Sequence, residues 1–450
     1  MNNTHFDVIV LGTGPAGSTI ARKAAKSGRR VAIVESREFG GTCALRGCNP
    51  KKVYVNAASL VDQVRRSDGK LVVDPGVKID WPTLLTFKKE FTEPVATKSE
   101  KSFQDDGITT IHGQSTFCGI DALTVDDRRL SAERIVVATG ATPAPLEIPG
   151  ADCITHSDEF MELASIPERV LFIGGGYISM EFSHVVARCG KQVTVVNRHP
   201  HVLSGFDPDL VQLLQTHSTA QGIAFRHERE VVGIELTDNG ERRVSLDNGD
   251  SIVCDLVVHG AGRVPNIAAL QLDEANIQHN SKGIIVDRFM QSSSNPHVFA
   301  AGDCAASGAQ MLTPTANEEA RIVASNLFAD DPEAVPDYGK VPKVVFTVPA
   351  IASVGMSEQE ARDAGHDIDV RFKDTSSSGS VRKLGSTVAG YKLIVDKTSD
   401  IVLGAHLLGP AAEESINLFA LAMKFNLSAT DIKSTLFAFP TFASDVRQMV

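Results

Sequence analysis

Short apolar runs of strand length alternate with longer helical patterns at the start of the chain. Residues 6–11 and 31–34 are two such runs, and a helical pattern through Ile20 and Ala25 runs between them to Gly28. This order of strand, helix and strand predicts a βαβ unit with parallel strands.

The same pattern returns about 160 residues later, with apolar runs at 170–173 and 193–196 on either side of a predicted helix at 180–190. One chain therefore carries two predicted dinucleotide sites. From Pro342 the pattern changes to alternating segments at 343–348 and 390–396, which indicates a separate C-terminal region.

The remaining predicted elements follow from the same periodicities. The predicted helices are 54–66, 82–106, 315–328 and 411–425, and the predicted strands include 108–111, 123–125, 135–138 and segments within 223–258. The Ser-rich run Thr375–Ser380 is predicted to be a solvated loop.

Glycine-rich turns follow the first strand of each βαβ unit. Gly12, Gly14 and Gly17 open the first helix, and Glu35 ends the second strand. Glycines at this spacing let a pyrophosphate approach the helix N-terminus, while the terminal acid can accept a hydrogen bond from a ribose hydroxyl. The second turn begins at Gly174, and Ser179 stands where a third glycine or an alanine is usual.

Charge and hydropathy narrow the classes of partner. The 450 residues carry a net charge of -11, which argues against nucleic acid or an anionic membrane as partner. The sequence has no apolar run of 18 residues, and its first residues lead directly into a strand rather than a signal peptide. We therefore expect a cytoplasmic protein that acts on a small molecule.

Two of the seven cysteines, Cys43 and Cys48, are close in sequence, between a glycine pair and Pro50. The odd, scattered cysteine count is not a secreted disulfide framework. A metal half-site would need a second Cys/His pair at ligand spacing, so no metal is expected. A helix N-terminus and basic neighbours favour a thiolate, so the pair is predicted to be a redox centre.

In motif order and over essentially its whole length, the chain resembles the flavoprotein pyridine nucleotide–disulfide oxidoreductases, such as glutathione reductase, lipoamide dehydrogenase and mercuric reductase. The motifs are the first GxGxxG with Glu35, GGTCxxxxCxPxK, ATGATP, GGGYISME, GAGRVPN and AAGD. The resemblance implies an α/β fold with two Rossmann-like domains and a C-terminal α+β dimerisation domain. The expected boundaries are 1–150 with 267–335 for FAD, 151–266 for NAD(P), and 340–450 for contact within a homodimer.

The resemblance also implies roles for individual residues. Cys48 is expected to exchange electrons with the flavin, and Cys43 to exchange with the substrate. Lys51 is preferred as the lysine near the flavin, paired with Glu181, although lipoamide dehydrogenases use the position of Lys52. The residues expected to bind the cofactors are Gly12, Gly14, Pro15, Ala16, Gly17, Glu35, Gly41, Thr42, Lys51, Gly113, Thr139, Gly140, Gly174, Gly176, Tyr177, Ile178, Glu181, Asn197, Arg198, Gly262, Arg263, Gly302, Asp303 and Thr313.

The end of the second unit's last strand bears on the choice of nicotinamide cofactor. An NAD site needs an acid where Asn197 stands, whereas Arg198 matches the residue that meets the 2′-phosphate in NADPH-using relatives. A second arginine of glutathione reductases would fall at Ser204. NADPH is therefore favoured over NADH.

The C-terminal segment does not identify the substrate. Most of the family carries an acid–base histidine and glutamate where this chain has Phe439 and Ser444. Losing such a group typically costs ~10²–10⁴ in rate. Arg22 and Arg321 match arginines near the glutathione pocket, but either could equally be a surface charge.

Several functions therefore stay open. The leading hypothesis is reduction of a small disulfide or a thiol-bound species. Reduction of mercury or another soft metal ion fits the tail, but this chain has no cysteine after Cys304. A quinone or electron-transfer flavoprotein and a redox-sensing protein are the further alternatives.

Overall fold

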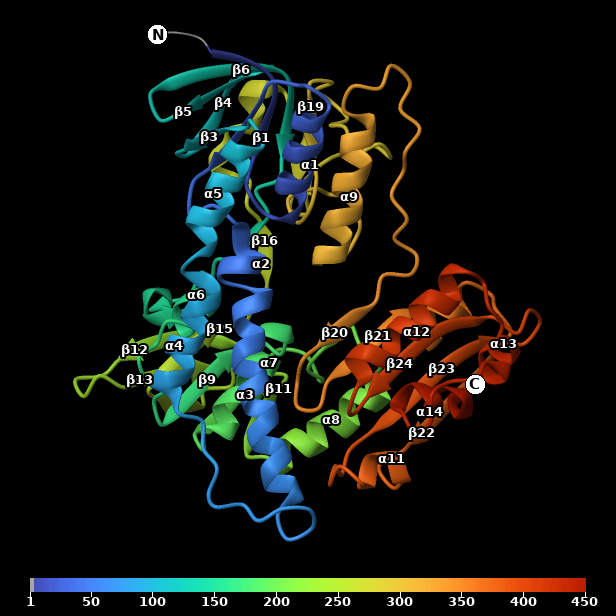
Figure 1. The fold of residues 1–450 in the computed structure, drawn as a ribbon. Coiled ribbons are helices and arrows are strands. Elements are labelled where there is room, and N and C mark those ends of the chain that lie inside the picture. The colour runs from blue at the N-terminus through green and yellow to red at the C-terminus, as the bar shows by residue number, and fades with distance from the viewer. Residues whose placement is uncertain (1–3) are drawn as a thin grey trace. The chain divides into compact units, whose positions relative to one another are not determined.

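The structure, a computed structural model, describes residues 4–450 and divides into two compact units built from interleaved segments (Figure 1). The first unit contains the chain up to Pro50, Phe87–Ala144 and Arg263–Tyr338. The second contains Lys51–Thr86, Pro145–Gly262 and Gly339–Val450. Among the described helices, none combines the length and apolar character that a bilayer-spanning segment needs.

The first unit is built on a parallel sheet that ends in an antiparallel hairpin. β1 (Thr4–Leu11) is buried between β2 (Val31–Glu35) and β6 (Arg128–Val137) and runs parallel to both. β3 (Thr109–His112) and β19 (Val298–Ala300) are also parallel to their neighbours. The carboxyl ends of these strands share one edge, which is where ligands bind in sheets of this kind.

The second unit contains a second parallel sheet, in the order β11-β10-β9-β15-β8. β9 (Arg169–Ile173) is followed by the second glycine turn and α7 (Tyr177–Arg188), and β10 (Gln192–Asn197) returns beside it. These elements agree with the predicted second βαβ unit. Buried Phe172, Phe182 and Val195 belong to the apolar core around this sheet.

The C-terminal part of the second unit is an antiparallel sheet in the order β20-β21-β24-β23-β22. α12 (Ala412–Lys424) packs on it, with Ile416 and Phe419 fully buried. The predicted change of architecture after Pro342 is therefore present.

The remaining bounds are as follows. The helices are α1 (Pro15–Lys26), α2 (Gly41–Leu45), α3 (Cys48–Ser67), α4 (Trp81–Thr92), α5 (Val95–Asp105), α6 (Ser157–Phe160), α8 (Pro208–Ala220), α9 (Thr313–Asn326), α10 (Glu358–Asp363), α11 (Gly379–Arg382), α13 (Ala429–Ser434) and α14 (Phe442–Met449), with 3-10 turns at Ala151–Cys153, Ala268–Leu270 and Leu272–Ala275. The strands are β4 (Ser115–Gly119), β5 (Ala122–Val125), β7 (Ala141–Pro143), β8 (Ile154–Thr155), β11 (Ile223–His227), β12 (Val231–Leu236), β13 (Arg242–Leu246), β14 (Ser251–Cys254), β15 (Leu256–His259), β16 (Arg263–Pro265), β17 (His279–Asn280), β18 (Gly283–Ile284), β20 (Lys343–Val345), β21 (Ile351–Gly355), β22 (Ile368–Asp374), β23 (Gly390–Asp396) and β24 (Val402–Leu408).

Two predicted elements were wrong in detail. The single helix at 82–106 is divided into α4 and α5, and Pro94, which has no N–H to donate, immediately precedes α5. The run Thr375–Ser380 is not loop throughout, because α11 begins at Gly379. There the hydroxyl of Ser378 accepts a hydrogen bond from the N–H of Val381 and caps the helix.

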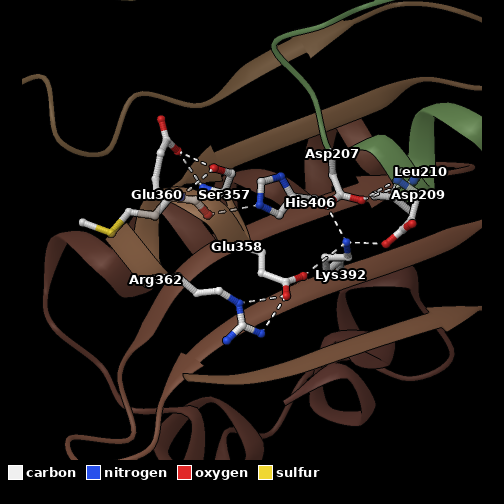
Figure 2. A network of polar contacts seen from close by, with 10 residues as sticks. Asp207, Asp209, Leu210, Ser357, Glu358, Glu360, Arg362, Lys392 and His406 are labelled. Carbon is white, nitrogen blue, oxygen red and sulfur yellow. Dashed lines mark hydrogen bonds and ion pairs between the residues drawn. The ribbon is translucent and has the colours of Figure 1, made fainter. Parts of the chain in front are cut away.

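A buried lysine joins α8, which follows the parallel sheet of the second unit, to the C-terminal antiparallel sheet of that unit (Figure 2). Lys392 on β23 lies 2.9 Å from Asp207, which caps α8, and also pairs with Asp209 and, at 3.7 Å, with Glu358. The side chains of Lys392 and Asp207 are only 5% and 2% exposed. Burial works against the charge of Lys392, but the hydrogen bonds to Asp207 and Asp209 raise its pKa.

Candidate active site

Cys43 and Cys48 lie on consecutive helices next to the first glycine turn. α2 carries Cys43, and Cys48 is the first residue of α3. Gly41 has a φ of 71°, and a Cβ atom there would lie 2.5 Å from the Cα atom of Gly14. The N–H of Gly40 donates to Thr13 Oγ1 at 2.9 Å. Glycine at position 41 therefore lets the cysteine segment pack directly on the turn.

The hydroxyl of Thr313, the first residue of α9, contacts both sulfur atoms. It donates to Cys43 Sγ at 3.5 Å and lies 3.8 Å from Cys48 Sγ. The two cysteines are not joined by a disulfide bond in this structure. The hydrogen bond to Cys48, and then burial, raise the pKa of Cys43, while Thr313 acts in the opposite direction.

The first glycine turn forms an open cradle between β1 and α1. A Cβ atom at Gly12 would lie 2.3 Å from the carbonyl oxygen of Ala138, and one at Gly17 would lie 2.0 Å from that of Gly12. At Gly14 a Cβ atom would meet nothing within 4 Å. Pro15 begins α1 and the next residue, Ala16, is buried. The tight backbone and the open space fit the pyrophosphate of a dinucleotide.

Glu35 is held at the carboxyl end of β2. Its Oε2 accepts hydrogen bonds from the N–H of Thr13 at 3.1 Å and from the Thr13 hydroxyl at 2.6 Å. The N–H of Gly113 donates to the Glu35 carbonyl oxygen at 3.0 Å. The carboxylate is therefore fixed beside the glycine turn, as its expected ribose contact requires.

The turns after β6 and β19 bring the other expected flavin residues to the same edge of the sheet. Thr139 and Gly140 follow β6, and Gly302 and Asp303 follow β19. Burial raises the pKa of Asp303, and the charge of Arg263 partly opposes this.

Glu319 on α9 was missed by the sequence reasoning. It is 1% exposed, and its carboxylate accepts hydrogen bonds from the N–H of Gly302 at 2.6 Å and from the hydroxyl of Tyr338 at 2.8 Å. Burial raises its pKa. A single glutamate among the polar residues of a predicted helix gave no signal of this contact.

Arg22 and Arg321, the candidate substrate arginines, both pair with nearby carboxylates. Arg22 lies 3.0 Å from Asp106 and 4.5 Å from the ring centroid of Phe103. Arg321 binds both carboxylate oxygens of Glu318, at 2.7 and 2.9 Å. These contacts agree with the surface-charge alternative for both residues.

Glu181 on α7 binds two lysines at once. Lys51 Nζ and Lys52 Nζ each lie 2.9 Å from Glu181 Oε2, while the N–H of Phe346 donates to Oε1 at 2.9 Å. The predicted Lys51–Glu181 ion pair is present, and Lys52 shares it. Burial opposes the carboxylate's charge, but the two ammonium groups and this N–H lower the pKa of Glu181. The Lys51 ammonium also lies 4.6 Å from the ring centroid of Tyr177.

The second glycine turn also lies close to neighbouring backbone. A Cβ atom at Gly174 would lie 2.4 Å from the carbonyl oxygen of Gly260, whereas one at Gly262 would meet nothing within 4 Å. Gly176 precedes α7, which begins with Tyr177 and Ile178, and Tyr177 is 46% exposed. The open space beside the turn is therefore at Gly262, which follows β15 at the carboxyl edge of the sheet.

Asn197 and Arg198 follow one another at the end of β10 but differ in exposure. Asn197 is 4% exposed and hydrogen-bonds to the loop that follows it. Arg198 is exposed, and its Nε lies 3.4 Å from Nε2 of His199. Of the two residues, Arg198 is therefore the one whose side chain can contact a phosphate group from solvent.

Phe439 and Ser444 stand where most of the family has an acid–base histidine and glutamate. The Phe439 side chain is 83% exposed. Ser444 belongs to the cap of α14, since its N–H donates to the hydroxyl of Thr441 at 3.1 Å. Neither residue can transfer a proton as an imidazole does.

Two family models match the chain: pyridine nucleotide-disulphide oxidoreductase over residues 6–320, and the dimerisation domain of the same family over residues 341–450. Glutathione reductase from Burkholderia cepacia is 32% identical, with 99% of this chain and 98% of the relative covered. Trypanothione reductase from Trypanosoma congolense is also 32% identical (99% and 95% covered), and dihydrolipoyl dehydrogenase from Geobacillus stearothermophilus is 30% identical (97% and 93%).

A solved structure agrees with these relatives. The Cu(II) complex of the HOCl-induced flavoprotein disulfide reductase RclA from Escherichia coli superposes with a TM-score of 0.89 at 27% identity, covering 100% of this chain and 99% of that one. The predicted α/β fold with Rossmann-like regions and a C-terminal dimerisation domain is confirmed.

Proposed function

Because this chain belongs to the pyridine nucleotide–disulphide oxidoreductase family, we propose that Cys43 and Cys48 are its redox-active pair and reduce a small disulfide substrate. The family makes the chain an FAD-dependent enzyme that uses NAD(P)H and acts on sulfur groups. FAD, when bound, accepts a hydride from the nicotinamide and supplies two electrons. The first glycine turn, Glu35 and Asp303 would hold it.

The cysteines then pass these electrons to the substrate. Two electrons and one proton, the equivalent of the hydride, break the Cys43–Cys48 disulfide bond and leave Cys48 as the thiolate and Cys43 as a thiol that donates a hydrogen bond to it. The Cys43 proton passes to Cys48 as Cys43 attacks one sulfur of the substrate, and the substrate's S–S bond breaks to release one thiolate. Cys48 next loses that proton and attacks Cys43 in the mixed disulfide, which releases the second thiolate and restores the Cys43–Cys48 bond. Solvent protonates both products, because Phe439 carries no proton to give.

The observation that carries this proposal is the contact of one hydroxyl, that of Thr313, with both thiols. Anaerobic titration with NADPH tests it. We expect a long-wavelength thiolate-to-flavin absorbance band that disappears in Cys48→Ser, together with loss of disulfide reduction in Cys43→Ser. Unchanged turnover in Cys43→Ser with glutathione disulfide, lipoamide and quinones would support an electron-transfer flavoprotein instead.

We further propose that NADPH is the electron donor. Arg198 is exposed at the end of β10 and can meet a 2′-phosphate, while Asn197 cannot act as the acid that an NAD site uses. The kcat/KM ratio for NADPH over NADH tests this, and Arg198→Met should lower it by about ten- to a hundredfold, because a charged hydrogen bond contributes ~1.5–3 kcal/mol.

The family's organisation supports the remaining assignments. We propose that residues 1–150 and 267–335 hold FAD, that 151–266 hold the nicotinamide cofactor, and that 340–450 join two copies in a homodimer. The odd, scattered cysteine count, which is not that of a secreted disulfide framework, supports a cytoplasmic location. Size-exclusion chromatography with light scattering tests the dimer.

A thiolate-bound copper ion is a second candidate substrate. The similar RclA structure is a Cu(II) complex, and here Phe439 removes the usual proton donor. Oxidation of the Cys43 thiol and the Cys48 thiolate to a disulfide releases one proton and reduces two Cu(II) ions to Cu(I), so no proton has to be delivered. An NADPH-dependent Cu(I) assay distinguishes this reaction from disulfide reduction. Mercuric reduction is not favoured, since the relatives found are disulfide reductases and lipoamide dehydrogenases.

A further inference from the structure

Asn197 occupies the position at which an acid would favour NADH, yet its side chain points into the protein. It is the last residue of β10 and is 4% exposed. A Cβ atom at Gly175 would lie 2.9 Å from Asn197 Cγ, so the carboxamide packs against the second glycine turn. A buried polar side chain in such a place requires hydrogen-bond partners.

Those partners are two carbonyl groups of the turn that follows. Asn197 Nδ2 lies 2.9 Å from the carbonyl oxygen of His199 and 2.8 Å from that of His201. An amide NH2 carries two donors, so both contacts can be made at once, whereas a carboxylate has none. The backbone of Asn197 is used as well, since its carbonyl oxygen accepts from the N–H of Arg229 at 3.2 Å.

The far end of the same turn is also fixed. The N–H of Leu203 donates to the carbonyl oxygen of Gly175 at 2.8 Å, and Leu203 has a φ of 50°. Residues 198–203 are therefore tied at both ends to the strand and to the glycine turn. Arg198 and His199, both exposed, project from this tied segment.

We propose that Asn197 is a positioning residue for NADPH specificity, because its amide shapes the 198–203 turn that presents Arg198 to the 2′-phosphate. The inference rests on the proposed use of NADPH and deepens it. It assigns Asn197 a structural task in specificity rather than a contact with the ribose.

Replacing Asn197 by aspartate distinguishes this inference from the rule that an acid at this position favours NADH. By that rule, Asn197→Asp supplies an acid for the ribose and should convert the site toward NADH. In this structure the new carboxylate would instead face two carbonyl oxygens, buried and without a donor, which is unfavourable. The turn should then open, weakening NADPH binding with no gain for NADH.

The test measures the dissociation constants of NADP⁺, NAD⁺ and adenosine 2′,5′-bisphosphate for the FAD-loaded wild-type enzyme, Asn197→Ala and Asn197→Asp by calorimetry. We expect both variants to bind NADP⁺ and the bisphosphate about tenfold more weakly, as for the loss of one to two neutral hydrogen bonds. NAD⁺ binding should stay within about twofold, which also shows that the variants are folded.

Three results would overturn the inference. The first is equal weakening of NADP⁺ and NAD⁺ binding in Asn197→Ala, which marks a merely structural role, and the second is tighter NAD⁺ binding by Asn197→Asp. Unchanged NADP⁺ binding in both variants would also overturn it. A wild-type enzyme that binds NAD⁺ as tightly as NADP⁺ would instead refute the proposed use of NADPH.

Discussion

Replacing Glu181 by glutamine tests the most highly charged contact of the candidate site. The substitution keeps the shape of the side chain and removes the charge that both lysines share. Lys51 is 8% exposed and Glu181 is 2% exposed, so the lost pair is largely shielded from water. Breaking one partner of a buried pair typically costs about 3–5 kcal/mol.

The geometry sets the size of the repulsion that remains. Each ammonium lies 2.9 Å from the same oxygen, so the two nitrogens can be no more than twice that distance, about 5.8 Å, apart. At an effective dielectric constant of about 20, two unit charges at that separation repel by about 3 kcal/mol. This is the smallest repulsion that the geometry with both ammonium groups in place allows. Lys52 is 32% exposed and can turn partly toward water, and that movement would reduce the repulsion in the variant.

The sign of the pH dependence follows from this repulsion. In Glu181→Gln the folded state disfavours two charged lysines, so it binds protons less well than the unfolded chain does. The loss of stability should therefore be complete near pH 7 and shrink as the pH rises toward the ordinary lysine range near ~10. Thermal unfolding followed by circular dichroism at pH 7 and pH 10 measures the loss of stability and its change with pH.

A second substitution and a surface control complete the test. Glu181→Gln combined with Lys52→Met should unfold at a higher temperature than Glu181→Gln alone, because one of the unpaired ammonium groups is gone. Glu168→Gln removes an exposed partner of Lys191 and should change stability by only about 0–1 kcal/mol. The reasoning is refuted if the double variant is no more stable than the single one and the deficit is the same at both pH values.

Three further outcomes are expected. Thr313→Val removes the hydroxyl between the thiols and should weaken the thiolate-to-flavin absorbance band without abolishing FAD binding; an unchanged band contradicts the role of that hydroxyl. Glu319→Gln should lower FAD affinity, measured by flavin release on dilution, because the amide cannot accept every hydrogen bond of the carboxylate; full retention of FAD argues against it. Lys392→Met should lower the Tm by several degrees, because Asp207 stays buried without a counter-charge, whereas Arg362→Met, at a 54% exposed pair, should not; equal shifts would count against the buried-charge argument.

Local patterns predicted the parts of the site that depend on local geometry. The glycine turns, the strands beside them and the close pair Cys43 and Cys48 all lie within short segments, where periodicity and glycine spacing act directly. The Lys51–Glu181 ion pair joins distant segments, and the resemblance to known motifs was needed to expect it.

Contacts with backbone outside a residue's own helix or strand were not predictable. Glu319 binds the N–H of Gly302, 17 residues earlier in sequence, and nothing in its own helix marks it as buried. The position of Asn197 at the end of a strand suggested a contact with the cofactor. Its amide instead donates to two carbonyl groups, and their positions depend on how the next turn folds. Lys52 was weighed against Lys51, but the structure pairs both with one carboxylate.

The Lys392 cluster bears on how this chain can be recombined with its relatives. A chimera that joined residues 1–340 to the C-terminal domain of another family member would separate Lys392 from Asp207 and Asp209. Unless the imported sheet carries a cation at the same place, Asp207 would be left as an uncompensated buried charge. For directed evolution by domain shuffling, the loop before α8 and strand β23 should therefore come from the same parent protein.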